Sequence, residues 1–145
     1  MLHSPSLILL AATFSLTVLS LTGASSAEDK PDAQPNRFFE LRTYHAAEGK
    51  LEALHARFRD HTNPLFKKHG MTIIAFWTPA DEPASKNTLI YILAYPDREA
   101  REKAWKEFQA DPDWIAAKAA SEKDGTLVLK VDSVFMNPTD YSPIK

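Results

Sequence analysis

The side chains best suited to chemistry lie in the segment FFELRTYHAAEGK, Phe38 to Lys50, where two charges and a phenol alternate with apolar residues. Glu40, Arg42 and Tyr44 are two residues apart, which places them on one side of a β-strand. An arginine beside a phenol can orient the carbonyl or carboxylate group of a ligand. The same residues can instead form a buried ion pair that fixes the register of neighbouring strands.

His61 is the one candidate for acid–base chemistry. It lies on the apolar side of a helical pattern, one turn before Pro64. Because proline removes a backbone hydrogen bond of the helix, the His61 imidazole could face a cavity there and act as a base near neutral pH. The alternative is a histidine packed at the boundary between helix and sheet. His55, His61 and His69 are too far apart along a helix to share a metal ion, so no metal site is expected.

The aromatic residues could form a pocket for a planar substrate. They are Phe76, Trp77, Tyr91, Tyr95, Trp105, Phe108 and Trp114. Trp77 and Tyr91 join Glu40, Arg42 and Tyr44 as candidates for a ligand pocket or for the interior of a dimeric barrel. The alternative is that the aromatic residues form the core, because those near the second helical pattern recur at helical spacing.

Several function classes are excluded by composition. The chain has no Cys, which rules out disulfides, thiolate metal sites and Cys nucleophiles. G-x-S-x-G, Walker and G-x-G-x-x-G motifs are absent. The net charge is −2 without a clustered basic stripe, so no nucleic-acid partner is expected. No cofactor is expected, since haem would need an axial His or Tyr beside a large cavity.

Three segments of different composition divide the chain. Residues 1–27 contain no Lys, Arg, Asp or Glu, and an apolar stretch is followed by small residues that end at Ala27. This pattern is typical of a secretory signal peptide cleaved after Ala27, with an uncleaved membrane anchor as the alternative. Residues 28–36 are polar and predict a disordered leader. Residues 37–145 then form one domain, which would be periplasmic or secreted and free of the membrane after cleavage.

The patterns within the domain alternate between strand and helix. Strands are expected at 37–45, 71–78, 88–95 and 126–136, and helices at 51–69, 97–110 and from 111 to Gly125. Pro64 predicts a kink in the first helix. The order βαββαβ favours a ferredoxin-like α+β fold: one four-stranded antiparallel sheet with the helices on one face and the first and last strands adjacent.

The alternation in the first strand suggests which side of the sheet is covered. We expect Phe39 and Leu41 to face the helices, and Glu40, Arg42 and Tyr44 to lie on the uncovered side. An open face that mixes charged and apolar residues is rarely left in water. We therefore expect two copies to stack these faces as a homodimer that forms a barrel.

The sequence also resembles a known family. FFELRTYHAAEGKLEAL, RDHTNPLFKKHGMTIIAFW, NTLIYILAYPDREAREKAWKEFQADPDW and DSVFMNPTDYSP are similar to the NIPSNAP family of the dimeric α+β barrel superfamily, from about Phe38 to Pro143. The resemblance implies the split βαβ monomer and the barrel dimer, but no reaction. The N-terminal signal departs from the usual family pattern.

These observations lead to one main hypothesis and two alternatives. The main hypothesis is an exported homodimer with a small-ligand or structural role, whose possible ligand is a small apolar molecule. The first alternative is a small cofactor-independent monooxygenase or isomerase acting on an apolar aromatic substrate, in which Arg42, Tyr44 and His61 orient and deprotonate the substrate. The second is a haem-binding barrel protein, as relatives with the same barrel imply.

Overall fold

The computed structural model describes Met1 and residues 37–145 of the chain. The signal peptide and leader expected from the sequence therefore lie, apart from Met1, outside the described residues. The strands are β1 (Phe38–Ala46), β2 (Thr72–Trp77), β3 (Thr88–Tyr95) and β4 (Val128–Met136). The helical elements are α1 (Leu51–Arg57), η1 (Phe58–Thr62), α2 (Asn63–Lys68), η2 (Ala84–Lys86), α3 (Arg98–Ala110) and α4 (Pro112–Ser121).

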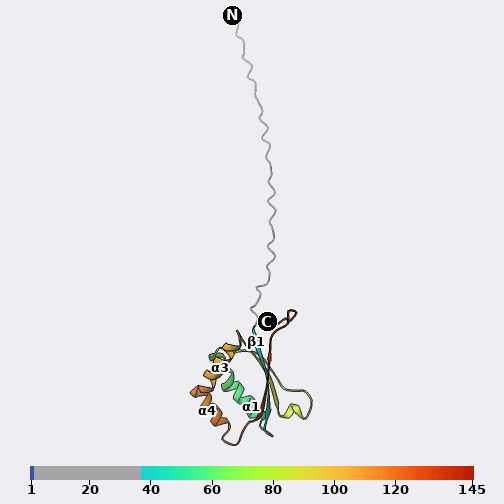
Figure 1. Ribbon diagram of the computed structural model, residues 1–145, viewed down its shortest axis with the longest axis vertical. Coiled ribbons are helices and arrows are strands. Elements are labelled where there is room, and N and C mark those ends of the chain that lie inside the picture. Colours follow the sequence, from blue (N-terminus) through green and yellow to red (C-terminus); the bar gives the residue numbers. More distant parts are fainter. Residues whose placement is uncertain (2–36) are drawn as a thin grey trace. The chain divides into compact units, whose positions relative to one another are not determined.

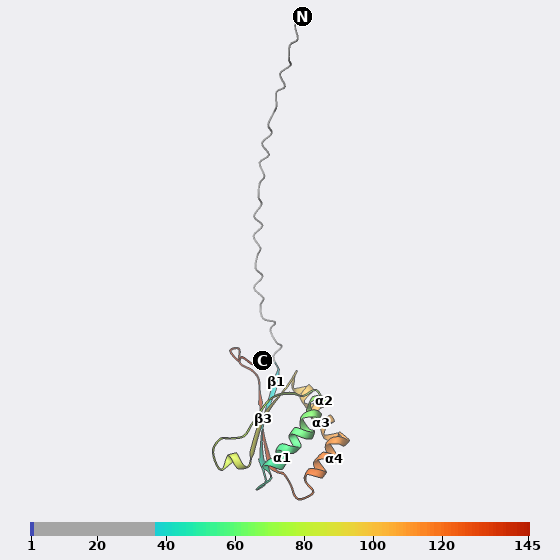
Figure 2. The ribbon, with the colours of Figure 1, turned by 180° about the vertical axis from the view of Figure 1, so that it is seen from behind.

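The four strands form one antiparallel sheet in the order β2-β3-β1-β4. Helices α1 to α4 lie together on one face of this sheet, as both views show (Figures 1 and 2). The first and last strands are neighbours. The ferredoxin-like α+β fold expected from the order of the elements is therefore confirmed.

The first helical region contains the irregularity that Pro64 predicts. It appears as η1, a π-helical turn in which the Asn63 amide donates to the Phe58 carbonyl five residues earlier. Proline has no amide hydrogen to continue the α-helical ladder, so the chain inserts one extra residue before it. The buried Thr62 hydroxyl donates to the Arg57 carbonyl at 3.2 Å and satisfies a second backbone acceptor in this turn.

The two later helices begin at the acidic caps that the sequence indicates. The Asp97 carboxylate accepts from the Ala100 amide at 2.7 Å, and the Asp111 carboxylate accepts from the Asp113 amide at 2.9 Å. Asp111 also binds His69 and Lys68 at 2.7 and 2.8 Å. The start of α4 is thereby tied to the end of α2.

The side of the sheet that carries Glu40, Arg42 and Tyr44 is the helix-covered side, so the expected orientation of β1 is wrong. Glu40 has no exposed surface and binds side chains of α3. Phe39 and Leu41 instead lie on the face without helices. The alternation rule failed because it assumes that charged residues face water, whereas these charges are paired with one another inside the protein.

The core lies between the sheet and the helices. Its most buried large side chains are Leu54, Phe66, Leu89, Tyr91, Leu93, Tyr95, Phe108 and Leu127. Tyr91 is paired with Arg42 across β1 and β3, so the two side chains share the helix-covered face. This pairing brings a phenol, a guanidinium and the aromatic core together.

The opposite face of the sheet has none of α1 to α4 over it, and its residues are mostly apolar. By strand register it carries Phe39, Leu41, Thr43, His45, Thr88, Ile90, Ile92, Ala94, Lys130, Asp132, Val134 and Met136. Val134 is 53% exposed, and Trp77, at the end of β2, is 48% exposed. The C-terminal segment reaches the Phe39 end of this face, where Ile144 and Phe39 line one shallow hollow and the Arg37 side chain donates to the Lys145 carbonyl at 2.6 Å. We call this surface the open face.

Candidate functional site

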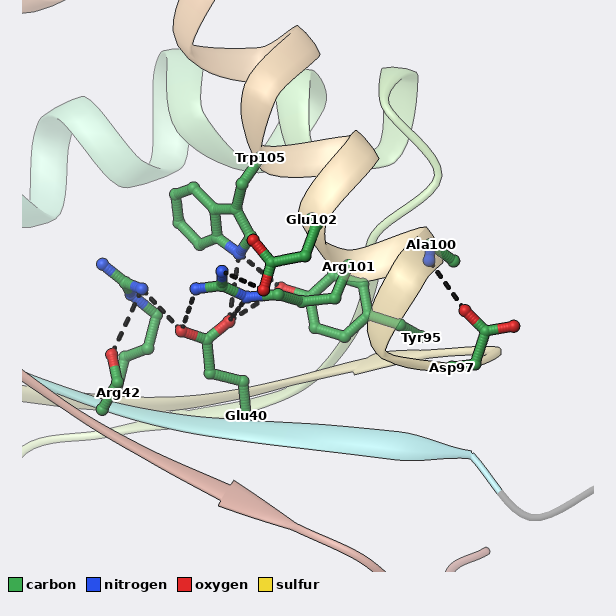
Figure 3. Close-up of polar contacts among 9 residues, drawn as sticks. Glu40, Arg42, Tyr95, Asp97, Ala100, Arg101, Glu102 and Trp105 are labelled. Atoms are coloured by element: carbon green, nitrogen blue, oxygen red, sulfur yellow. Dashed lines mark hydrogen bonds and ion pairs between the residues drawn. The ribbon is translucent and has the colours of Figure 1, made fainter.

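The Glu40 carboxylate is the centre of a buried polar cluster beneath α3 (Figure 3). Oε1 accepts from Arg42 Nη1 at 2.6 Å and from Arg101 Nη2 at 2.8 Å. Oε2 accepts from Arg101 Nε at 2.9 Å, from the Trp105 indole at 3.0 Å and from the Tyr95 hydroxyl at 3.3 Å. Arg101 binds the carboxylate with two parallel bonds, the strongest geometry for such a pair. One carboxylate thus joins β1, β3 and α3.

The cluster keeps Glu40 ionised. Burial acts to raise the pKa of the Glu40 carboxyl, but hydrogen bonds from Arg101 and Arg42 and their positive charges outweigh it and hold the pKa below its usual value. Burial also raises the pKa of the Tyr95 phenol, which therefore stays protonated and donates to Glu40. The pKa of Arg101 is raised by its hydrogen bonds to Glu40.

Two buried donors beside this cluster have no hydrogen-bond partner among the described residues. They are Arg42 Nε and the Tyr91 hydroxyl. Arg42 uses Nη1 for Glu40 and for Ser133, at 2.6 and 3.3 Å, and its guanidinium lies 4.3 Å from the centre of the Trp105 ring. Buried polar groups are nearly always satisfied in folded proteins. Of these two residues Arg42 lines a cavity and Tyr91 does not, so the Arg42 guanidinium is the candidate partner for an acceptor supplied from outside the chain.

Arg42 reaches a cavity of about 510 Å³ between the sheet and the helices. Its aromatic walls are Phe58, Phe66, Trp105, Phe108 and Trp114. The remaining lining residues are Arg42, Tyr44, Thr62, Gln109, Ile115, Lys118, Ala119 and Glu122. A cavity of this size, mostly apolar with a few polar groups, is typical of a site for a small organic molecule. We call it the Arg42 cavity.

A second hollow of about 430 Å³ adjoins the Arg42 cavity at the side of α3. Arg42, Trp105 and Gln109 line both spaces. The other residues around the second hollow are Arg101, Glu102, Lys106 and Ala110. The shared residues form a boundary with aromatic walls on one side and charged groups on the other.

The structure brings together four of the residues singled out in the sequence and separates two. Glu40, Arg42, Tyr44 and Tyr91 all lie on the helix-covered side of the sheet, although only Arg42 and Tyr44 line the cavity. Trp77 lies at the end of the edge strand β2, where it is paired with Ile90 and borders a groove beside α1 and η1 instead of the Arg42 cavity.

His61 is exposed and lines a different groove, beside Asp60 and α4. No histidine lines the Arg42 cavity. The base required by the hypothesis of a cofactor-independent enzyme is therefore not placed beside Arg42 in this structure.

Three partners of Glu40 were not expected from the sequence, namely Tyr95, Arg101 and Trp105. Arg101 and Trp105 belong to α3 and are four residues apart, so they lie on the same side of that helix. The spacing of the arginine and the tryptophan places both on one side of a predicted helix, but nothing in the sequence indicates that they contact a strand some 60 residues earlier.

Residues 37–145 contain neither a metal-binding cluster nor a membrane-spanning helix. Within that range no three His, Asp or Glu side chains gather in a way that could hold a metal ion. The helices described there include none long and apolar enough to cross a membrane.

The fold and the cavity define a ferredoxin-like α+β protein with a pocket between sheet and helices. The chain belongs to the NIPSNAP family, whose sequence pattern matches residues 39–143. No curated protein matches the chain significantly.

Solved structures with the same fold come from bacteria. A NIPSNAP family protein of unknown function from Agrobacterium tumefaciens str. C58 is 22% identical, with a TM-score of 0.65 over 77% of this chain and 96% of its own. A second one from that organism is 19% identical, with a TM-score of 0.66 over 75% and 99%. An uncharacterized NIPSNAP domain protein from Burkholderia xenovorans is 22% identical, with a TM-score of 0.62 over 73% and 98%. These likenesses establish the fold.

The Glu40 cluster gives a pH-dependent contribution to stability. Because the folded-state pKa of Glu40 lies below the unfolded value of about 4.3, its stabilisation is present above that pH and is lost as the pH falls through the folded-state pKa. Glu40→Gln should lower the free energy of unfolding at pH 7 by about 3 kcal/mol, since it leaves two arginines without their counter-charge. Its stability should also fall less steeply than that of the wild type below pH 4.3.

Urea unfolding between pH 3 and 7 measures both effects. The control is Glu102→Gln, which removes a carboxylate that is 60% exposed and should change stability by less than about 0.5 kcal/mol. Equal losses in the two variants would contradict a special role for Glu40.

Proposed function

We propose that this protein is an exported, homodimeric small-molecule-binding protein, and that its ligand carries a flat apolar ring and occupies the Arg42 cavity. One observation carries the proposal: the cavity has aromatic walls, and at its edge lies a buried guanidinium with an unpartnered Nε. Folded proteins rarely contain an unfilled apolar space, and they rarely contain a buried donor without an acceptor.

The aromatic walls favour a ring over a flexible chain. The Phe108 and Trp114 rings are 4.6 Å apart and inclined by 34°, and the Phe66 ring lies 5.0 Å from Phe108. Flat ligands pack well against such surfaces by offset or edge-to-face contacts. The cavity lining offers Tyr44, Thr62 and Gln109 as further hydrogen-bonding groups.

Brominated rings test the proposal, because bromine quenches nearby tryptophan fluorescence. In a Trp77→Phe variant both remaining tryptophans, Trp105 and Trp114, line the Arg42 cavity. We expect 4-bromobenzoate, 4-bromobenzamide or both to quench the emission of this variant saturably. Adding Ala119→Phe, which fills the cavity from α4, should weaken that binding at least about tenfold.

The matched control is Ala120→Phe. Ala120 is exposed on the same helix but lines the groove near His61 instead of the Arg42 cavity. It should leave binding unchanged. Absence of saturable quenching by either compound, or equal losses from the two phenylalanine variants, would contradict binding in the Arg42 cavity.

The homodimer is proposed through the open face. Leu41, Ile90 and Ile92 lie at the middle of this face on the two central strands, and helices α1 to α4 all lie on the opposite side of the sheet. At the end where His45 lies, the surface carries charges of both signs: Lys130 binds Asp132 at 2.8 Å. A patch with apolar residues and both signs of charge can complement itself across a two-fold axis.

Light scattering during gel filtration at micromolar concentration tests the dimer. The wild type should contain two chains. Val134→Glu should raise the dimer dissociation constant at least about a hundredfold, because it buries an unpaired carboxylate at the interface. Ile115→Glu alters an α4 side chain that is 57% exposed, similar to the 53% of Val134, and should remain dimeric. A wild type of one chain, or a dimeric Val134→Glu, would refute this interface.

Export is proposed from the uncharged, apolar composition of residues 1–27 and the small residues before Glu28. Expression of the full chain in a Gram-negative host, followed by fractionation and intact-mass measurement, should give a periplasmic protein that begins at Glu28. A membrane-bound protein of full-length mass would instead support a retained anchor.

A further inference from the structure

We propose that the ligand of the Arg42 cavity is an aromatic organic anion, with its ring between the aromatic walls and its carboxylate at Arg42. This inference rests on the proposed function and specifies the chemical class of the ligand. Three independent features support it: the charge around the cavity, the unpartnered donor, and the separation of polar and apolar ends.

The charge around the two adjoining hollows is positive, although the whole chain has a net charge of −2. Counting the lining residues and their buried ion-pair partners, the cationic side chains are Arg42, Arg57, Arg101, Lys106 and Lys118. The anionic ones are Glu40, Glu102 and Glu122. Five cations and three anions give the site an excess of two positive charges, which one or two negative charges on a ligand would balance. A bound carboxylate would bring the site closer to neutrality.

The acidic side chains of the site already have partners. Glu40 accepts from Arg42, Arg101 and Trp105, Glu102 accepts from Arg101 Nη1 at 3.3 Å, and Glu122 accepts from Arg57 Nη1 at 2.9 Å. These carboxylates are therefore not available to attract a cationic ligand.

The unpartnered group that faces the cavity is a donor. Arg42 lines the cavity, and its guanidinium uses only Nη1 in hydrogen bonds within the described residues, which leaves Nε without a partner. A guanidinium can only donate hydrogen bonds, so it is matched by a ligand group that only accepts them, as an ionised carboxylate does.

The polar and apolar ends of the site are separated. Phe66, Phe108 and Trp114 form one end, whereas Arg42 lies at the boundary with the hollow that contains Arg101 and Lys106. Trp105 lies between them, in contact with Phe66 on one side and under the Arg42 guanidinium on the other. An anion approaching past Lys106 would meet Arg42 first and place its ring beyond Trp105.

The pair 4-bromobenzoate and 4-bromobenzamide tests this inference, because the two rings match while only the acid is charged at pH 7. In the Trp77→Phe protein we expect the acid to bind about tenfold more tightly than the amide. In Trp77→Phe/Arg42→Gln this ratio should fall to about one. In Trp77→Phe/Lys106→Gln, which changes an exposed residue, acid binding should weaken about twofold, whereas the matched exposed change Lys67→Gln should have no effect.

The possible results separate this inference from the proposed function. Equal saturable binding of acid and amide would overturn the anion inference and leave the ring-binding function standing. Absence of binding by both would overturn both. Since Arg42→Gln could disturb folding, the acid-to-amide ratio of the Trp77→Phe protein and the Lys106→Gln result each decide the question without it.

Discussion

The structure depends on one buried carboxylate that holds the helical layer to the sheet. Glu40 lies on a central strand, has no exposed surface, and accepts hydrogen bonds from Arg42 on its own strand and from Arg101 and Trp105 on α3. A buried charge is costly unless its lone pairs are filled, and here they are. This requirement fixes both the rotation of α3 about its axis and the side of β1 that faces inward.

The cavity follows from this arrangement. The Trp105 indole nitrogen donates to Glu40, and the Trp105 ring forms one wall of the cavity. Arg42 donates to Glu40 through Nη1, and its Nε has no partner among the described residues. The π-helical turn before Pro64 places Phe58 and Thr62 on another side of the same space. The cluster that stabilises the fold also orients the groups that we propose bind the ligand. A variant that disturbs Glu40 should therefore affect stability and binding together.

Local patterns predicted the elements of the fold well, because they depend on short-range physics. Alternation gave the first and last strands, and runs of β-branched, aromatic and other apolar residues gave the two between them. Asp97 and Asp111 gave the helix starts, and Pro64 gave the break in the first helix. The orientation of β1 could not be obtained in this way. Residues with opposite charges two apart on a strand are compatible with either face, and the choice depends on partners in α3 that are distant in sequence.

The same limit applied to the candidate site. Arg42 and Tyr44 line the cavity, while Tyr91 lies behind them, and all three were singled out from residue type and spacing. His61 has a suitable residue type but is exposed in another groove. The next residue of the π-helical turn, Thr62, lines the Arg42 cavity instead.

The most direct measurement is an NMR titration of the Glu40 side-chain carboxyl in ¹³C-labelled protein, assigned by comparison with Glu40→Gln. We expect the Glu40 signal to remain that of an ionised carboxylate as the pH falls below about 4.3, the ordinary value for glutamate, until the protein unfolds. Titration at or above that value would show a carboxyl that is exposed or unpaired. That result would contradict the buried ion cluster on which the fold and the proposed site depend.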